Sequence, residues 1–497
     1  MGLRQKAVVG LGDWVNGRWL RTSHGMTLCS RSPADLGDVM GYYDTDVSHA
    51  SVAIEAAKMA LVRWRRAPLS ERIECLHRYR DALVARRDEL VIAIARSVGK
   101  PLWEAKTEVD AMVAKVNITL GPGIESLRAR EVEPGAWVRF RPVGVCVVLG
   151  PFNFPGHLAN GHIVPALALG NTVIFKPSER APMVGEIMAE CFEAAGFPQG
   201  VVNVVQGDGT VAQALVESPE IDAVMFTGST VVGQRIIRTS ASHVGRMLAL
   251  EMGGNNPAII CDDADISHAV REVGFSAFVT AGQRCTAVRR VLVHRRVAQE
   301  FTERLAACAT LSKVGSPSER ESFLGPVISA QAKQETLDWV LSLGAKLHPI
   351  VSLESANVPG FEGHYLRPGV YEVDHQTMQT LGAHEWFAPL VFVQPVDDDE
   401  AMISQANCTQ FGLASAVFSS SQERFRRIAD ELECGLVNWN RGTVGSSSRL
   451  PFGGVKSSGN HRAAGLSSAL YCVDPVAELH LPLPVAGMTM PGFYAPE

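Results

Sequence analysis

Cys285 and Glu251 are the two residues of this sequence whose types and surroundings best suit covalent chemistry. Cys285 stands in the segment Gln283-Arg284-Cys285-Thr286, and Glu251 opens the glycine-containing segment Glu251-Met252-Gly253-Gly254 upstream of it. A thiol nucleophile needs a base, either to activate the thiol or to activate the water that later releases its product. These two residues could be that pair, although most single cysteines are small buried hydrophobes and the signal alone is weak.

Asn153 is a candidate for stabilising negative charge. It lies in the segment Pro151-Phe152-Asn153-Phe154-Pro155, directly after the apolar, β-branched run 143–149, which we interpret as a strand. Ligands of parallel sheets bind at the carboxyl ends of strands, where an amide NH₂ can donate to an oxyanion, a contact worth roughly 10²–10³ in rate. An asparagine that only stabilises its own turn is an equally good interpretation of this segment alone.

Lys176, Ser178 and Glu179 follow the next short apolar run, 172–175, and suggest a nucleotide site. A lysine and a glutamate three residues apart at a strand end can both reach ribose hydroxyls. A glutamate that faces the 2′-hydroxyl would repel a 2′-phosphate, which favours NAD over NADP. An exposed loop with ordinary charges is the alternative.

The segment 226–233 ends a further apolar run and opens a helix. Gly228 permits a tight turn, and the helix N-terminus offers free N–H groups to a pyrophosphate. Only Gly228 and Gly233 are present, so this is not the G-x-G-x-x-G fingerprint, and a plain helix cap is a fair alternative. Gly209 belongs to a weaker turn that could approach the same nucleotide.

Glu385 and Phe387 precede the apolar run 390–393. A carboxylate and an aromatic ring at such a strand start could hold a ribose and flank a ring, with ordinary loop structure as the alternative. The Gly- and Ser-rich loops at 438–441 and 451–461 could line the mouth of a substrate site.

Alternation of short strands and helices predicts two α/β domains that position these residues. The first has strands near 143–149, 172–175, 201–205 and 223–226, and a second alternating region runs from about 258 to 450. Residues 50–118 are expected to be helical, with Ser70 as an N-cap. The stretch 127–141 reads as a hairpin around Pro134-Gly135, and the tail after Tyr471 could add a strand, so both could serve subunit contacts.

Composition limits the class of protein. The 497 residues are 46% hydrophobic and 20% charged with a net charge of −6, and no block of like charge indicates a nucleic-acid or membrane partner. No apolar run approaches the ~20 residues of a membrane span, and the N-terminus lacks a signal peptide. The ten cysteines form no C-x-x-C pair or zinc spacing. We therefore expect a reduced, cytoplasmic protein without a metal site.

Taken together and in order, these segments resemble the aldehyde dehydrogenase superfamily over essentially the whole chain. The resemblance implies an α/β fold with a Rossmann-type cofactor domain, an α/β catalytic domain and a small β oligomerisation element. The implied bounds are 1–126 and 142–252 for the NAD-binding domain, 253–450 for the catalytic domain, and 127–141 with 468–490 for the oligomerisation strands. A homodimer or homotetramer is expected.

The resemblance also implies a role for each matching residue. Cys285 would attack the aldehyde to give a thiohemiacetal, Asn153 with the backbone N–H of Cys285 would form the oxyanion hole, and Glu251 would activate the water that hydrolyses the thioester. Residues assigned to the NAD cofactor are Lys176, Ser178, Glu179, Gly209, Phe226, Gly228, Ser229, Thr230, Val231, Val232, Gly233, Glu385 and Phe387.

A narrower resemblance within the superfamily points to the N-succinylglutamate 5-semialdehyde dehydrogenases of bacterial arginine catabolism. It is carried by the segments 156–165, 281–286, 438–440 and 458–462, and by Asn255, where most of the superfamily has lysine. That substrate carries carboxylates, for which Arg284, Arg441 and His461 are hypothetical partners. A structural salt bridge is the alternative for either arginine. Ala388, where the superfamily usually has glycine, and the loop 442–450 depart from the pattern.

Four functions could be built on these residues. The first is NAD-dependent oxidation of a semialdehyde, or of a different aldehyde, to its acid. An acylating dehydrogenase that passes the thioester to coenzyme A would not need Glu251. A non-catalytic scaffold would have no physical need for Cys285, Glu251, Asn153 and Lys176 together. A thiol hydrolase would need a histidine base beside the cysteine, and no motif supplies one.

Overall fold

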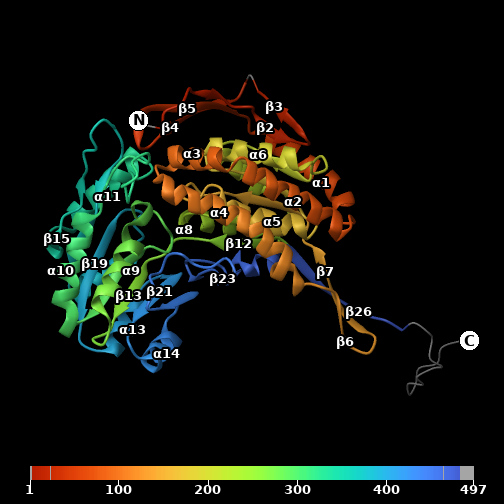
Figure 1. Ribbon diagram of the computed structural model, residues 1–497. Coiled ribbons are helices and arrows are strands. Elements are labelled where there is room, and N and C mark those ends of the chain that lie inside the picture. Colours follow the sequence, from red (N-terminus) through yellow and green to blue (C-terminus); the bar gives the residue numbers. More distant parts are fainter. Residues whose placement is uncertain (1–2, 23, 463, 482–497) are drawn as a thin grey trace, which may run out of the picture.

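The computed structural model describes residues 3–22, 24–462 and 464–481. Figure 1 shows two α/β bodies side by side, a small N-terminal sheet above them, and a three-stranded sheet that projects away from the rest. The α/β fold predicted from the alternation of strands and helices is confirmed.

The first body is built on a seven-stranded sheet with the order β12-β11-β8-β9-β10-β2-β3. Strands β8 to β12 are parallel, and β2 and β3 join antiparallel at one edge. The chain moves outward from β8 in one direction through β9 and β10, then returns to the other side of β8 for β11 and β12. A ligand crevice is expected at that change of direction, where the carboxyl ends of β8 and β11 meet. The strand bounds are Asp13–Val15 (β2), Arg18–Leu20 (β3), Val145–Leu149 (β8), Thr172–Lys176 (β9), Val202–Val204 (β10), Ala223–Thr227 (β11) and Met247–Glu251 (β12).

Helices cover both faces of this sheet because its strands are apolar on both sides. Cys146 and Val148 pack among α2 to α6, whereas Val145 and Val147 pack among α1, α7 and α8. The helices are Ser48–Trp64 (α1), Leu69–Ala85 (α2), Arg87–Val98 (α3), Leu102–Ile118 (α4), His157–Ala168 (α5), Pro182–Ala195 (α6), Gly209–Glu217 (α7) and Thr230–Ser240 (α8). A π-turn at Thr119–Gly123 follows α4.

The predicted helical region 50–118 divides into α1 to α4. The break after α3 is at Gly99, which adopts φ 81° and stands two residues before Pro101. The expected N-cap at Ser70 is wrong: α2 begins at Leu69, after Pro68, and no side chain caps it. Proline fixes a backbone angle suited to the residue before a first turn, so a hydroxyl cap is not required there.

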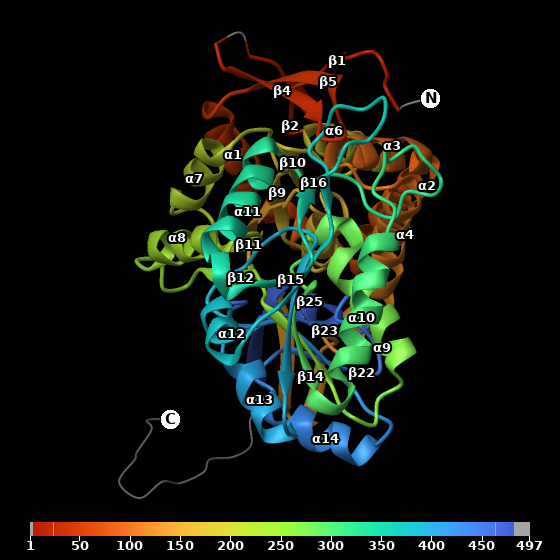
Figure 2. The same ribbon diagram turned by 90° about the vertical axis from the view of Figure 1, so that its left-hand side faces the viewer.

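The second body has another seven-stranded sheet, in the order β15-β18-β19-β14-β13-β21-β22, parallel except for β15. Figure 2 shows α9 and α10 on one side of it and α12 on the other. The strands are Asn256–Ile260 (β13), Val288–His294 (β14), His348–Val351 (β15), Gly369–Glu372 (β18), Leu390–Val396 (β19), Ala414–Phe418 (β21) and Leu436–Trp439 (β22). The helices are Ile266–Phe278 (α9), Arg295–Leu311 (α10), Ala330–Leu343 (α11), His375–Leu381 (α12), Asp399–Asn407 (α13) and Gln422–Glu431 (α14).

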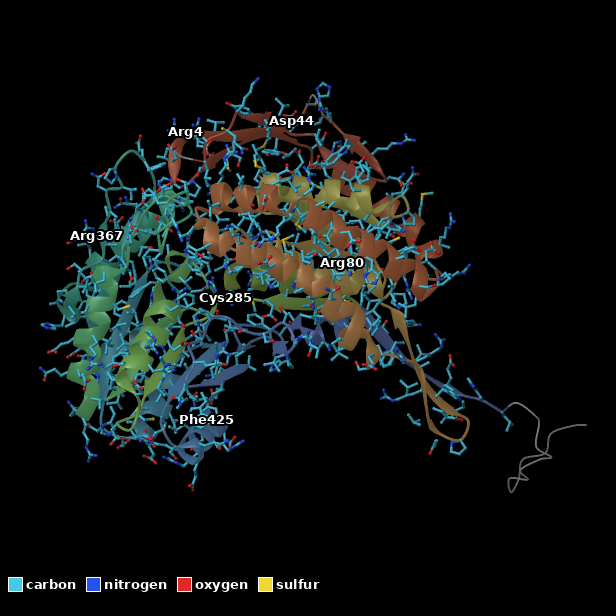
Figure 3. All side chains as sticks on the ribbon, viewed as in Figure 1. Arg4, Asp44, Arg80, Cys285, Arg367 and Phe425 are labelled. Atoms are coloured by element: carbon cyan, nitrogen blue, oxygen red, sulfur yellow. The ribbon has the colours of Figure 1, made fainter. Side chains whose placement is uncertain are left out.

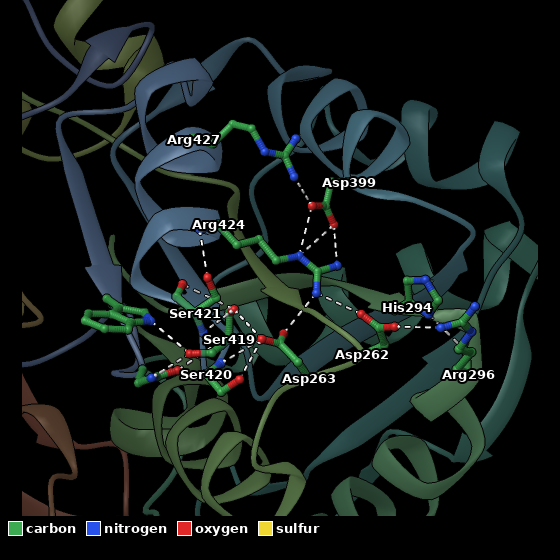
Figure 4. Close-up of polar contacts among 12 residues, drawn as sticks. Asp262, Asp263, His294, Arg296, Asp399, Ser419, Ser420, Ser421, Arg424 and Arg427 are labelled. Atoms are coloured by element: carbon green, nitrogen blue, oxygen red, sulfur yellow. Dashed lines mark hydrogen bonds and ion pairs between the residues drawn. The ribbon is translucent and has the colours of Figure 1, made fainter.

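An ion cluster around Arg424 joins three elements of this body (Figure 4). The guanidinium of Arg424, on α14, lies 2.8 Å from Asp262 and 3.0 Å from Asp263, after β13, and 2.6 Å from Asp399 at the start of α13. Arg427 also pairs with Asp399. One cation thus balances carboxylates from segments far apart in the sequence and fixes α13 and α14 against the end of β13.

The projecting sheet consists of β6 (Arg130–Glu133), β7 (Ala136–Pro142) and β26 (Val473–Leu479), all antiparallel. These strands fall in the expected oligomerisation segments 127–141 and 468–490, except that β7 extends to Pro142. Residues 482–490 are outside the described residues. The N-terminal sheet contains β1 (Val8–Val9), β4 (Met26–Ser32) and β5 (Asp35–Thr45). Short two-stranded sheets pair β16 (Glu354–Ser355) with β17 (Leu366–Arg367), β20 (Phe411–Gly412) with β24 (Val455–Lys456), and β23 (Pro451–Phe452) with β25 (Ala464–Gly465).

Candidate active site

Cys285 lies at the junction of the two bodies (Figure 3), in a strained loop between α9 and β14. Thr280, Ala281 and Gly282 have φ values of 59°, 52° and 70°. A side chain at Gly282 would come within 2.0 Å of the Ala388 carbonyl oxygen, so only glycine fits. Strain of this kind persists only where the surroundings hold it in place.

Hydrogen bonds from both bodies fix this loop. Asn153 Nδ2 donates to the Gln283 carbonyl oxygen at 2.9 Å, and Asn256 Nδ2 donates to the Cys285 carbonyl oxygen at 2.7 Å. Asn153 is buried after β8, so the amide expected at a strand end lies beside the nucleophile loop. An amide nitrogen carries two N–H groups, and the bond to Gln283 uses one of them.

Glu251 shares a cavity of about 240 Å³ with Cys285. It is the last residue of β12 and is buried, and its Oε2 has no hydrogen-bond partner among the described residues. Burial raises the pKa of Glu251 well above its usual value, against a backbone hydrogen bond from Ala464 that lowers it. A buried carboxylate with a free oxygen and a raised pKa is suited to act as a general base.

Cys285 lines this cavity and is partly exposed. Burial, together with the nearby Glu385 and Glu251 carboxylates, raises its pKa to about 12, and Arg289 acts in the opposite direction. The thiolate is the nucleophilic form of cysteine, and a positive charge near the sulfur favours that form.

The expected cofactor residues gather at the carboxyl ends of β9 and β11. Lys176 Nζ donates to the carbonyl oxygens of Pro177 and Gly207 at 2.7 and 2.6 Å and lies 3.8 Å from Glu179. Burial lowers the pKa of Lys176, and Glu179 opposes that shift. Ser178 is buried next to them, while Gly209 opens the neighbouring α7.

The start of α8 is the second part of this region. Ser229 caps the helix by accepting a hydrogen bond from the Val232 N–H at 3.4 Å. Val231 and Val232, in the first turn, are 67% and 41% exposed although both are apolar. Gly228 and Gly233 have no room for a side chain, because Phe226 and Met252 pack against them. A helix N-terminus flanked by exposed apolar side chains suits a phosphate attached to a flat organic group.

Glu385 and Phe387 lie close to Cys285 on the catalytic side. Glu385 Oε1 accepts a hydrogen bond from the Gly254 N–H at 2.9 Å, and the Phe387 ring lies 6.0 Å from that of Phe152. Burial raises the pKa of Glu385, and Arg289 lowers it.

The three hypothetical carboxylate partners are placed differently. Arg284 lines the cavity, but its guanidinium bonds Glu104 at 2.9 Å and Thr280 at 2.7 Å, so its charge is already balanced. Arg441 and His461 are exposed and do not line the cavity, and His461 has φ 62°. The structure therefore does not bring Arg441 and His461 to Cys285, because both lie on outward-facing turns.

Residues for which the sequence predicted no role make up much of the cavity wall. They are Thr107, Glu108, Lys115, Phe154, His157, His162, Thr286 and the serines Ser446, Ser447 and Ser448. Burial lowers the pKa of Lys115 to about 8, and its Nζ donates to the Gly465 carbonyl oxygen and to Ser468 Oγ. For Thr107, Glu108 and Lys115, the only sign in the sequence of a place in the cavity wall is a polar residue inside a helix. Ordinary buried contacts produce the same pattern.

Residues 3–22, 24–462 and 464–481 contain no cluster of three or more histidine, cysteine or carboxylate side chains placed to hold a metal ion. In the same part of the chain no helix is both long and apolar enough to cross a membrane.

Comparison with known proteins gives one family. The model of the aldehyde dehydrogenase family matches residues 19–474. The N-succinylglutamate 5-semialdehyde dehydrogenase of Erwinia tasmaniensis is 42% identical over 475 residues, which cover 94% of each chain. The enzyme of the same name from Cronobacter sakazakii is 41% identical over 478 residues, covering 94% of this chain and 95% of the relative.

Solved structures agree in fold. A 1-pyrroline-5-carboxylate dehydrogenase from Thermus with bound NAD superposes with a TM-score of 0.89 at 28% identity, covering 95% of this chain and 93% of that one. An NAD-dependent aldehyde dehydrogenase from Sinorhizobium meliloti gives a TM-score of 0.90 at 27% identity, covering 97% of both chains.

Proposed function

The chain belongs to the aldehyde dehydrogenase family and is an oxidoreductase that acts on aldehydes, and we propose that it oxidises N-succinylglutamate 5-semialdehyde to N-succinylglutamate with NAD. The observation that carries the proposal is the single cavity that holds Cys285, Glu251 and the loop tied to Asn153. Relatives that are named for this substrate are about 40% identical in sequence to this chain, which supports the choice of substrate.

In the proposed mechanism the Cys285 sulfur attacks the aldehyde carbon and forms a thiohemiacetal. The remaining N–H of Asn153 Nδ2 and the backbone N–H of Cys285 stabilise the oxyanion. NAD supplies the acceptor for the hydride that this carbon loses as it becomes a thioester. Glu251 then takes a proton from the water that attacks the thioester, which releases the acid and restores Cys285.

The residues present fit a dinucleotide. The N-terminus of α8, with Gly228 and Ser229, would hold the pyrophosphate, and the exposed Val231 and Val232 would pack against the adenosine. Lys176 and Glu179 would hold the adenosine ribose, and Glu385 with Phe387 the nicotinamide ribose. The Glu179 side chain is 44% exposed and free to face a 2′-hydroxyl, which supports NAD as the preferred cofactor.

The cavity wall supports a carboxylate-bearing substrate. Lys115 has one N–H beyond its two hydrogen bonds, and the hydroxyls of Ser446, Ser447 and Ser448 lie at the same cavity. A substrate that carries two carboxylates needs hydrogen-bond donors of this kind along the cavity wall. The exposed positions of Arg441 and His461 do not support a contact between these side chains and the substrate.

Subunit association is proposed for the projecting sheet. Strands β6, β7 and β26 leave the main body, and Leu479 is 88% exposed. Such a sheet offers backbone groups and apolar side chains to a second copy, in keeping with the expected homodimer or homotetramer. Light scattering that gave the mass of one chain would contradict this part of the proposal.

The test is NADH formation with three aldehydes: N-succinylglutamate 5-semialdehyde, unsubstituted glutamate semialdehyde and a neutral aliphatic aldehyde of similar length. We expect kcat/KM for the succinylated substrate to exceed the others by about 10² or more, the scale of one or two lost charged contacts. Preference for the neutral aldehyde would overturn the substrate while leaving the family chemistry. The Cys285→Ala variant, expected to bind NAD without turnover, controls for background oxidation.

A further inference from the structure

Arg289 is a fully buried arginine whose charge no carboxylate in the described part of the chain pairs with at salt-bridge distance. It is the second residue of β14. Its Nη2 donates to the Arg284 carbonyl oxygen at 3.0 Å, its Nη1 to the Ala388 carbonyl oxygen at 3.4 Å, and its Nε has no hydrogen-bond partner. A buried charge with so few partners is costly, so it calls for a function.

The next residue, Arg290, shows what a structural arginine looks like at the same depth. Neighbouring strand residues point to opposite faces of the sheet, and Arg290 points away from Cys285. Its guanidinium donates to Asn255 Oδ1 and to three carbonyl oxygens, at 2.7 to 3.0 Å, and leaves no nitrogen unpartnered. Arg289 lacks such a set of acceptors although the same strand carries both.

Arg289 faces the groups that react. It bonds the carbonyl of the residue before Cys285, and its guanidinium lies 5.5 Å from the centre of the Phe387 ring. The Glu385 carboxylate lies against Gly253, and the Cys285 carbonyl oxygen lies against Gly254, so little space separates them. The charges of Glu385 and Glu251 therefore act on the Cys285 thiol.

We propose that Arg289 is a positioning residue that supplies the positive charge for the Cys285 thiolate, acting across the space between β14 and the nucleophile loop. The inference deepens the proposed function, because it rests on Cys285 as the nucleophile. In the step concerned, the thiol loses its proton to solvent, and the sulfur keeps the electron pair with which it attacks. Arg289 does not touch the substrate.

The charges around Cys285 agree with this placement. Burial raises the thiol pKa, and so do two carboxylates, Glu385 in the loop before β19 and Glu251 at the end of β12, whereas Arg289 lowers it. Arg284, the adjacent cation, is paired with Glu104. Burial lowers the pKa of Arg289 itself to about 10, with Glu385 and Cys285 opposing that shift, so it stays charged at neutral pH.

The test measures the thiol directly, without substrate or NAD. Iodoacetamide alkylates a thiolate: sulfur bonds to the CH₂ carbon and iodide leaves. Peptide-resolved mass spectrometry of the full-length protein reports the rate at Cys285 between about pH 6 and about pH 9, where the rate follows the thiolate fraction. Exposed Cys29, on β4, is the internal reference.

We expect Arg289→Met to slow alkylation of Cys285 about tenfold or more at each pH, equivalent to a rise of about one pKa unit, with Cys29 unchanged. Arg289→Lys should restore most of the rate, because the charge is kept. Glu385→Gln should speed the alkylation of Cys285. If Arg289→Met does not fold, this variant tests independently how charge near the thiol sets its alkylation rate.

Three results would overturn the inference: an unchanged Cys285 rate in folded Arg289→Met, an Arg289→Lys variant as slow as the methionine variant, or no acceleration in Glu385→Gln. Because the assay contains no aldehyde, a wrong substrate leaves its outcome unaffected. If Cys285 were not the nucleophile, Cys285→Ala would retain turnover, which distinguishes that failure from this one.

Discussion

Replacing Glu104 with glutamine should loosen the loop that carries the nucleophile. Glu104 lies on α4 of the first body and is fully buried. It accepts a hydrogen bond from Thr280 Oγ1, pairs with Arg284 at 2.9 Å and lies 3.9 Å from Lys100. Thr280 is the first of the left-handed residues before Cys285, so this carboxylate holds strained backbone from a distant helix.

The expected cost follows from the partners that remain. Lys100 keeps Glu108 at 2.8 Å, but Arg284, which is 13% exposed, loses its only carboxylate among the described residues. Breaking a buried ion pair by removing one partner costs about 3–5 kcal/mol. Glutamine keeps the size and one acceptor, so we expect about 2–4 kcal/mol, together with a fall in kcat because the loop is less well fixed.

The matched control is Asp110→Asn on the same helix. Asp110 pairs with Arg87 but is 60% exposed, and exposed pairs contribute about 0–1 kcal/mol. Urea unfolding followed by circular dichroism, with steady-state kinetics on the same samples, compares the two variants. If Glu104→Gln matched Asp110→Asn within about 1 kcal/mol and kept its kcat, the idea that Glu104 supports the nucleophile loop would be refuted.

Three further expectations concern catalysis, cofactor choice and acid stability. Glu251→Gln should give a burst of about one NADH per site and then stall at the thioester, since deacylation lacks its base; unchanged steady-state turnover contradicts that role. Glu179→Gln should narrow the preference for NAD over NADP, seen as a lower KM for NADP; an unaltered ratio of kcat/KM values counts against a ribose contact. Hydrogen bonds from Arg424 lower the folded-state pKa of Asp262, so its stabilisation is present above the unfolded value of 3.8 and is lost as pH falls through the lower folded value. The difference in melting temperature between the unmodified protein and Arg424→Met should therefore shrink as pH falls below about 3.8, and a constant difference would argue against it.

The elements that the sequence predicted correctly depend on local patterns of residues. Short β-branched runs predicted the strands that precede Asn153 and Lys176, because apolar runs and turn residues are local signals. The same local patterns predicted two α/β bodies. The predicted Ser70 cap is wrong because α2 begins earlier, at Leu69 directly after Pro68, and a single hydroxyl is a weak signal beside a proline.

Local sequence patterns do not predict how the charges in the site are paired. Arg284 was a candidate to bind the substrate carboxylates, but it pairs with Glu104, which lies 180 residues away in the sequence. The sequence around either residue gives no sign of this pairing. Lys115 and His157 line the cavity from two different helices, and Arg441 and His461 turn outward from loops that looked equally suitable.

The sequence by itself determined the types of chemistry available: a thiol, a carboxylate and an amide, each next to a strand end or a tight turn, in an order that resembles one family. The tertiary structure alone decided which charges face Cys285 and which are already paired. The physical reason is that strand and turn preferences act over a few residues, whereas burial and ion pairing depend on distances in space that the folded chain sets. Arg289 and Arg290 make the point, since adjacent residues of the same type face opposite sides of one strand and meet different surroundings.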